Sequence, residues 1–439
     1  MTNLMDKPVS MLDVPVPAGP AWLEAYRSRA RSRFPGFPTL RDEAWRYTNI
    51  TPILETPFQP AISAARDVSA DDVQHVRVPE LDSSLLVFVN GRYRADLSDA
   101  DELGKGVVSL PLHEAVRSHA ELLEEHLGTA SGEHEDPFTT LNDAMVSDGL
   151  FVHVSDGARP DRPIEVLSIA TRTAEPVASH PRNLVVVGKE ARATVLEHYV
   201  TLDDDAVYLN NAVTELIAAP SATVEHYLLE RESERAFNIS TLAIRQAAES
   251  VVHSHTVLLG GRIVRNNVTP VLAGERAHCL INGLYVGHRE QHLDNAMRVR
   301  HAAPQCESRQ YYKGIMNDRS RGVFTGRIVV DKIAQKTDAI QSNRNMLLSD
   351  DARVNARPQL EIYADDVRCT HGATTGRVDD EAVFYFMSRG LSEPVARAML
   401  VYAFAAEGFD RMELVPVRRL LAAEMIDKLP MARGLSIEV

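Results

Sequence analysis

The chain has 439 residues and a mass of 48.6 kDa, which is too long for one ordinary compact core and predicts several domains or one elongated repeat body. Its 61 acidic residues outnumber 47 lysines and arginines, and the net charge of −14 argues against general nucleic-acid binding, which needs clustered positive charge. Three widely spaced cysteines, Cys279, Cys306 and Cys369, argue against a disulfide framework and favour a reducing cytoplasm. No apolar run approaches the roughly 18 residues of a membrane span, and Met1–Pro20 lacks the pattern of a signal peptide.

The first third of the chain mixes helical and strand patterns. Residues 1–20 hold four prolines and are interpreted as a loose leader. Apolar residues at helical spacing predict a helix over 21–33. Residues 85–89 predict a buried strand, with Asn90-Gly91 as the turn of a hairpin. Residues 110–147 predict further helices.

From about residue 149 to residue 363, short Val, Ile and Leu runs alternate with Gly, Asn, Asp or Pro, which predicts stacked sheets without long helices. The string Ala193–Tyr199 resembles Ala222–Tyr227 at an offset of 29 residues between the two alanines. Periods of about 20–50 residues are typical of solenoids. The pattern therefore favours a β-helix over a sandwich.

The end of the chain returns to helical patterns, with Asp379-Asp380 and Ser392 as helix caps. We therefore predict a mainly β fold of three regions: a mixed α/β region over 1–150, a parallel β-helix over 151–365 and a helical region over 366–439. The aromatic run Phe384-Tyr385-Phe386 is interpreted as helix core.

Cys369 and His371 are the conspicuous candidates for chemistry. Residues two apart in an extended strand point to the same face, and a thiolate beside an imidazole ligates Fe, Zn or Cu. The same pair can instead activate the thiol as a nucleophile. Two ligands do not close a four-coordinate site, so a metal here needs further ligands from this chain or a partner. The plain alternative is that the cysteine is a small buried hydrophobe.

Other reactive residue types are assigned to structure. His253 and His255 are interpreted as hydrogen-bonded, half-buried histidines, and Cys279 and Cys306 as core thiols. His198 and His226 are interpreted as equivalent positions of the repeat. The chain contains no GxxxxGK[ST], HExxH or GxSxG string, which excludes a P-loop ATPase and weighs against an enzyme.

A long ordered set of strings carries a resemblance. They are Glu43-Ala-Trp-Arg-Tyr-Thr48, Gly322-Val-Phe-Thr-Gly326, Ala334-Gln-Lys-Thr-Asp-Ala339, Leu360-Glu-Ile-Tyr-Ala-Asp-Asp-Val-Arg-Cys-Thr-His-Gly-Ala-Thr374 and Phe384-Tyr-Phe-Met-Ser-Arg-Gly390. Together they resemble the SufB/SufD family of iron–sulfur cluster assembly scaffold proteins. Within that family the Cys-x-His-Gly-Ala form resembles the SufD branch.

The resemblance implies a right-handed parallel β-helix flanked by helical regions and a non-enzymatic role. It implies a heterodimer with a SufB-like paralogue and a SufC-like ABC ATPase bound through the C-terminal helices. It also implies a nascent iron–sulfur cluster at the SufB interface, with no cofactor stably bound. His371 is then the residue that faces a cysteine of the paralogue, with Cys369 beside it as the weaker candidate ligand.

Three alternatives remain open from the sequence. The first is that the chain is a SufB-like paralogue. The second is a β-helix enzyme that acts on polysaccharide, and the third is a homodimer that only templates a partner. A polysaccharide enzyme needs clustered carboxylates in a groove, whereas the acidic residues here fall mainly in turns and helices. We also expect the isolated chain to form a homodimer, because the exposed side of a long β-helix needs covering.

Overall fold

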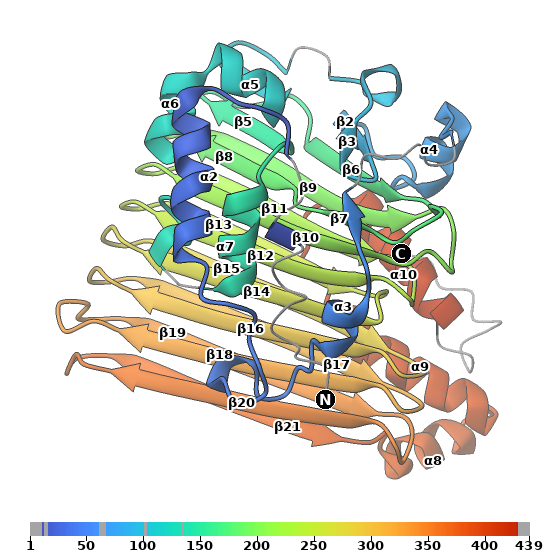
Figure 1. Cartoon of the computed structure of the whole chain (residues 1–439). Coiled ribbons are helices and arrows are strands. Elements are labelled where there is room, and N and C mark those ends of the chain that lie inside the picture. The colour runs from blue at the N-terminus through green and yellow to red at the C-terminus, as the bar shows by residue number, and fades with distance from the viewer. Residues whose placement is uncertain (1–10, 13–15, 61–66, 101–102, 134–135, 429–439) are drawn as a thin grey trace.

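The computed structural model describes residues 11–12, 16–60, 67–100, 103–133 and 136–428. Its centre is a stack of coils, and each coil from β8 onward gives one strand to each of two sheets (Figure 1). The first sheet contains β4 (Val107–Pro111), β5 (Leu150–Val154), β8 (Arg182–Val187), β10 (Tyr208–Ala218), β12 (Phe237–Gln246), β14 (Ile263–Leu272), β16 (His292–His301), β18 (Arg321–Val330) and β20 (Arg353–Ile362). Short strands β1 (Gln59–Pro60) and β7 (Val177–Ser179) pair beside it.

The second sheet contains β3 (Arg92–Tyr93), β2 (Ser84–Val89), β6 (Ile164–Ala170), β9 (Arg192–Thr201), β11 (Thr223–Arg231), β13 (Val251–Leu258), β15 (His278–Gly287), β17 (Glu307–Met316), β19 (Asp338–Leu347) and β21 (Arg368–Gly376). All pairs from β8 to β21 are parallel. The predicted mainly β fold with a parallel β-helix core is therefore confirmed.

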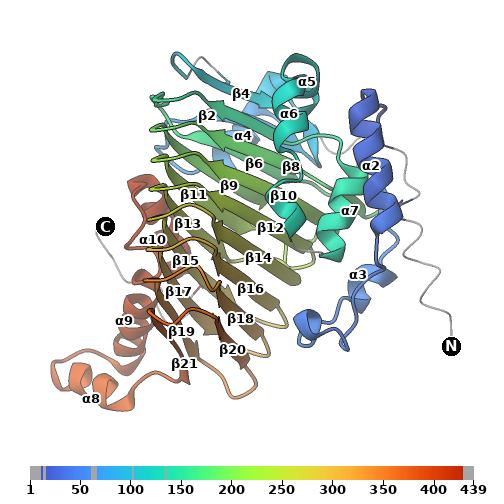
Figure 2. The same cartoon turned by 90° about the vertical axis from the view of Figure 1, so that its left-hand side faces the viewer.

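The N-terminal elements cover the outer face of the first sheet and the start of the stack (Figure 2). They are α2 (Ala21–Arg33), η1 (Glu43–Trp45), α3 (Thr51–Glu55), α4 (Ala70–Val76), η2 (Ala95–Leu97), α5 (Leu112–Ser118), α6 (Ala120–His126), η3 (Ser131–Glu133) and α7 (Pro137–Met145). The predicted helix over 21–33 and the hairpin at Asn90-Gly91 are confirmed. Most of the predicted leader over 1–20 lies outside the described residues.

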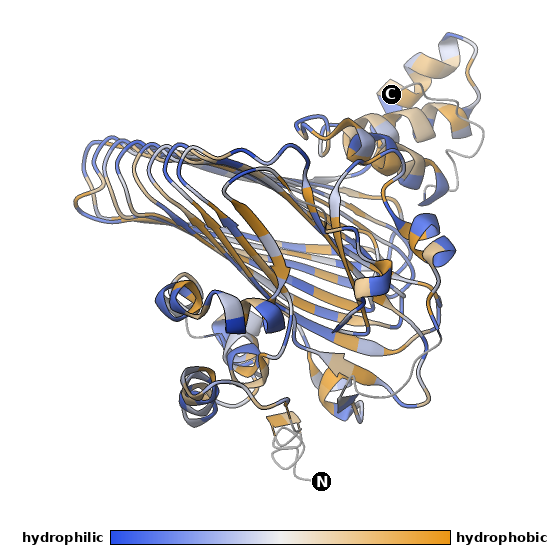
Figure 3. Ribbon diagram, turned by 90° about the horizontal axis from the view of Figure 1, so that it is seen from above, coloured by the Kyte–Doolittle hydropathy of each residue, from blue (hydrophilic) through white to orange (hydrophobic). Residues whose placement is uncertain are grey.

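The three C-terminal helices lie on the opposite side of the stack from the N-terminal elements, and the last two of them pack against the second sheet (Figures 2 and 3). They are α8 (Asp380–Ser388), α9 (Glu393–Ala406) and α10 (Val415–Lys428). The interpretation of the aromatic run as helix core is wrong for two of its members, because Phe384 is 72% and Tyr385 is 55% exposed on α8. The domain limits at 150 and 365 stay predictions. The two sheets also include strands outside the range 151–365, including β2, β3 and β4 before it and β21 after it.

One corner of each coil is built from a non-glycine residue with φ between 56° and 60°: Glu190, Ser221, Glu249, Arg276, Gln305 and Lys336. This left-handed conformation is unfavourable for L-residues. Each of these residues donates its backbone N–H to a carbonyl in the corner of the next coil. The stacked corners are thus held by hydrogen bonds between coils.

The two similar strings around His198 and His226 are not in register. Tyr227 pairs with Leu196 rather than with Tyr199. Because side chains alternate between the faces of a strand, an odd shift exchanges the faces. His226 therefore lies inside the β-helix and His198 lies on its outer face, and their interpretation as equivalent repeat positions is wrong.

Candidate functional site

The predicted Cys-x-His pair lies on β21, the last strand of the second sheet (Figure 1). β21 pairs with β19 along one edge only, and its other edge has no partner among the described strands. Cys369 is partly buried, whereas the other eight residues of β21 are exposed. The pair therefore lies at the open end of the stack.

The register places both candidate ligands on one face. Cys369 pairs with Ala339 and His371 pairs with Gln341, and both partners on β19 are buried. The Gln341 side chain crosses the interior, since a Cβ on Gly326 of the opposite sheet would lie 2.2 Å from its amide nitrogen. Cys369 and His371 thus face the interior side of the last coil, which no further coil covers.

The two side chains have different surroundings. Cys369 packs on a small apolar cluster that includes Ile328, Val330 and Ala364. Burial raises the pKa of its thiol, and the nearby Asp338 carboxylate raises the pKa further. His371 is exposed to solvent. Among the described residues, no group of three or more His, Cys, Asp or Glu is arranged to hold a metal ion.

The remaining predicted residues are structural. His253 bonds Glu225 at 2.6 Å and is partly buried, as predicted. His255 is hydrogen-bonded to Asn282 at 3.3 Å, as predicted, but it is fully buried rather than half-buried. Cys279 and Cys306 are buried, as predicted. Cys306 follows a left-handed corner residue, at the position where other coils place a small buried Ala, Ser or Thr.

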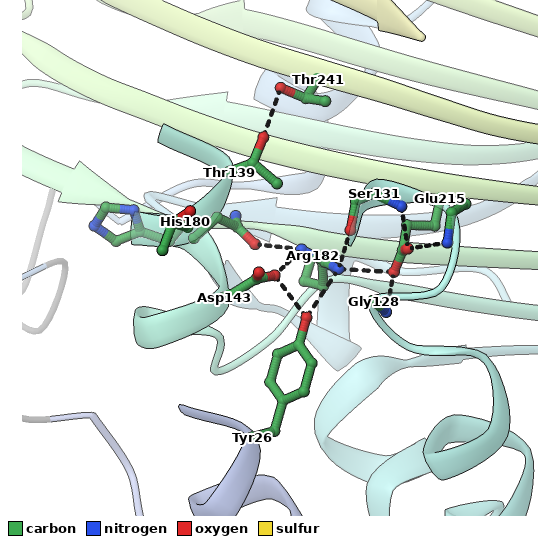
Figure 4. Close-up of polar contacts among 12 residues, drawn as sticks. Tyr26, Gly128, Ser131, Thr139, Asp143, His180, Arg182, Glu215 and Thr241 are labelled. Atoms are coloured by element: carbon green, nitrogen blue, oxygen red, sulfur yellow. Dashed lines mark hydrogen bonds and ion pairs between the residues drawn. The ribbon is translucent and has the colours of Figure 1, made fainter. Parts of the chain in front are cut away.

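The sequence reasoning missed a buried charged cluster under the N-terminal helices (Figure 4). Arg182 of β8 is fully buried and forms ion pairs of 2.7 Å with Asp143 and with Glu215. Tyr26 of α2 donates a 2.6 Å hydrogen bond to Asp143. Burial favours the neutral form of Glu215, yet Arg182 and the N–H groups of Gly128 and Ser131 hold the pKa of this carboxyl below its usual value. The cluster joins four elements, α2, α7, β8 and β10, that are far apart in the sequence.

A second cluster explains the Glu43–Thr48 string. The Arg265 guanidinium lies 4.0 Å from the centre of the Trp45 ring and forms an ion pair with Asp294. The Thr48 hydroxyl donates to the same carboxylate at 2.5 Å. The string therefore anchors the N-terminal segment to β14 and β16.

Fold and site together define a class of protein. It is a two-sheet β-helix, covered along both sides by helices, that presents a thiol and an imidazole on a last strand with one free edge among the described strands. In the described part of the chain, no helix has the length and apolar character that crossing a membrane requires.

Comparison with known proteins gives the family. Residues 169–404 match the model of the SUF system FeS cluster assembly SufBD core domain, and residues 18–166 match that of the SufBD protein N-terminal region. The chain is 33% identical to the iron-sulfur cluster assembly protein SufD of Escherichia coli over 397 residues, which is 90% of each chain. It is 31% identical to an iron-sulfur cluster assembly SufBD family protein of Synechocystis over 390 residues, covering 87% of this chain and 85% of the relative. The SufD protein of Bacillus subtilis is 26% identical over 92% of this chain and 93% of its own. The chain belongs to the SufBD family and is SufD-like.

Proposed function

We propose that this chain is a non-enzymatic, SufD-like subunit that helps to build a nascent iron–sulfur cluster at an interface with a SufB-like paralogue. The cluster is cargo that is assembled and passed on. Cys369 and His371 are the ligands or iron contacts that this chain contributes. The observation that carries the proposal is the position of this pair on the interior side of the last coil, beside the edge of β21 that pairs with no described strand.

The chemistry of the pair supports a shared site. A thiolate and an imidazole suit iron and iron–sulfur clusters, but two ligands leave a cluster incomplete. Burial and Asp338 raise the pKa of the Cys369 thiol, so metal binding must displace its proton. A partner that supplies the other ligands would complete the site, and few ligands on each chain would allow the cluster to leave.

The edge of β21 supports the partner surface. An unpaired strand edge presents free N–H and C=O groups that pair readily with another chain. We propose that the paralogue covers this edge in the complex and that a second copy covers it in the isolated chain.

The C-terminal helices support a second partner. Phe384, Tyr385 and Met387 on α8 are all exposed, and clustered exposed aromatic residues are typical of binding surfaces. We assign this surface to a SufC-like ATPase. The free thiols of Cys279, Cys306 and Cys369 fit our placement of the protein in the cytoplasm.

The test is anaerobic reconstitution of the chain with its SufB-like and SufC-like partners, in the wild type and in His371→Ala. We expect His371→Ala to lower the iron and sulfide content and the visible absorption of the complex, while its mass on size exclusion is unchanged. Thr370→Ala is the matched control, because this exposed neighbour on β21 points to the other face. An unchanged cluster in His371→Ala would move the chemistry to the partner and leave this chain as architecture.

A further inference from the structure

A large cavity lies far from β21, at the covered end of the stack. It has a volume of about 1190 Å³ and lies between the start of α2, α5, the hairpin after β2, and β7. Ligand sites are typically clefts of roughly 300–1,000 Å³ with apolar walls and a few placed polar groups. The cavity is thus large enough for an organic molecule.

Its walls are mainly apolar, and several of them come from rigid elements. The apolar lining residues include Leu23, Phe58, Tyr93, Val116, Met145 and Ala178. Leu23 and Met145 are buried in the packing of α2 and α7. These side chains give the cavity a fixed apolar surface.

The neutral polar groups of the lining include two N–H donors. Asn211 donates a 3.1 Å hydrogen bond to Nδ1 of His180, and burial lowers the pKa of His180 to about 4. The imidazole is therefore neutral and carries its proton on Nε2, which has no partner among the described residues. Figure 4 shows His180 pointing away from the Arg182 cluster. The buried indole N–H of Trp22 also lacks an acceptor in the described part of the chain.

The charged groups of the lining favour an anion. Arg92 and Arg117 line the cavity and are exposed. Asp148 is the one acidic residue among the described lining residues, and its carboxylate already accepts hydrogen bonds from the His113 ring at 3.0 Å and from the backbone of Gly149 at 2.9 Å. Two guanidinium groups and the Nε2–H donor of His180 thus remain for a ligand that brings acceptors.

We propose that this cavity binds an organic anion with an apolar body. Its acidic group is held by Arg92 and Arg117, its body lies on the apolar wall, and a further acceptor atom takes the Nε2–H group of His180. This site is separate from the cluster site on β21 and does not depend on the proposed function.

The probe for the test is 8-anilinonaphthalene-1-sulfonate, an aromatic anion whose fluorescence rises in apolar surroundings. Its neutral analogue, N-phenyl-1-naphthylamine, lacks the sulfonate. Both are titrated into the purified full chain, with fluorescence and calorimetry as readouts. Energy transfer from tryptophan reports proximity, and Trp22→Phe shows how much of it comes from the cavity.

We expect one anion per chain, at least tenfold weaker binding in the double variant Arg92→Glu and Arg117→Glu, and a smaller loss in His180→Phe. The control Arg319→Glu makes a charge reversal on a distant exposed turn and should leave the affinity unchanged. The neutral analogue should bind the wild type and the double variant equally. Unchanged anion affinity in the double variant, an equal loss for the neutral analogue, or undiminished energy transfer in Trp22→Phe would each overturn the proposal. Circular dichroism of each variant checks that the substitutions leave the fold intact.

Discussion

Strands β8 and β21 lie near opposite ends of the β-helix and have very different surroundings. All six residues of β8 are buried beneath the N-terminal helices, whereas β21 has one partly buried residue and one free edge. At β8, Arg182 is matched by two carboxylates. At β21, Cys369 and His371 are not part of any comparable cluster of charged partners or metal ligands in the described part of the chain. The difference teaches that the chain completes its own polar contacts at the β8 end, whereas at the β21 end, where we propose that a partner binds, the described residues leave such contacts unmade.

The largest expected effect tests the covered end. Arg182→Met leaves Glu215 and Asp143 without their cation in a buried site, and removal of one member of a buried ion pair costs roughly 3–5 kcal/mol. Urea denaturation should show this loss of unfolding free energy. Arg276→Met, which breaks an exposed ion pair with Glu249, should change stability little. Equal losses of unfolding free energy in the two variants would show that the buried cluster at the covered end is no more important for stability than an exposed ion pair.

The pH dependence of stability tests a buried carboxyl in the same half of the stack. Burial and the neighbouring Glu230 raise the pKa of Glu232 from 4.5 to about 8. Between these values the folded state keeps a proton that the unfolded state has lost, so this group makes stability fall as pH rises, by at most about 1.4 kcal/mol per pH unit.

Glu232→Gln cannot ionise, so its stability relative to the wild type should increase from pH 5 to pH 8 in denaturation experiments. Glu234→Gln, a partly exposed neighbour that pairs with Arg289, serves as the control. A constant difference between Glu232→Gln and the wild type across this range would show that the carboxyl titrates normally.

A third prediction concerns the exposed α8 surface next to the open end. Phe384→Asp should weaken binding of the SufC-like ATPase by about 2 kcal/mol, or roughly thirtyfold, because exposed aromatic residues often dominate interfaces. Calorimetric titration measures the change. Leu40→Asp places the same charge at another exposed apolar position and should not affect binding. Full affinity in Phe384→Asp would assign the ATPase to another surface.

The substitutions with the smallest expected effect on stability lie at the edge of β21, where they test the oligomeric state. Static light scattering should give a dimer mass for the isolated chain and a monomer mass for the double variant Thr370→Lys and Thr374→Lys, because lysines on an edge strand block pairing. Ser28→Lys with Ser32→Lys adds the same charge to exposed positions of α2 and should remain dimeric. A monomeric wild type would defeat the idea that the open end needs a partner.

Much of the fold was predictable from local patterns. The short apolar runs between turn residues predicted the β-helix, because strands without intervening helices bury their faces only by stacking. Helix α2 ends where the Phe-Pro-Gly-Phe-Pro string begins, since Pro and Gly cannot continue a helix. The Cys-x-His spacing alone placed both side chains on one face of a strand, and the register of β21 agrees.

Other features depend on contacts between distant residues and leave no local pattern. The offset of the similar strings did not reveal their true register, and an odd shift moves His198 and His226 to opposite faces. The charged cluster brings Tyr26, Asp143 and Glu215 to Arg182 from four elements.

The sequence by itself determined the class of fold, the family resemblance and the candidate ligands, because periodicity and short strings are local properties of the chain. Only the tertiary structure decided that Cys369 and His371 lie on an uncovered last coil, that Phe384 is exposed, and that a cavity lies under α2 and α5. These properties depend on what packs against each residue. Packing is set by the stacking of coils and by the path of the terminal segments across them.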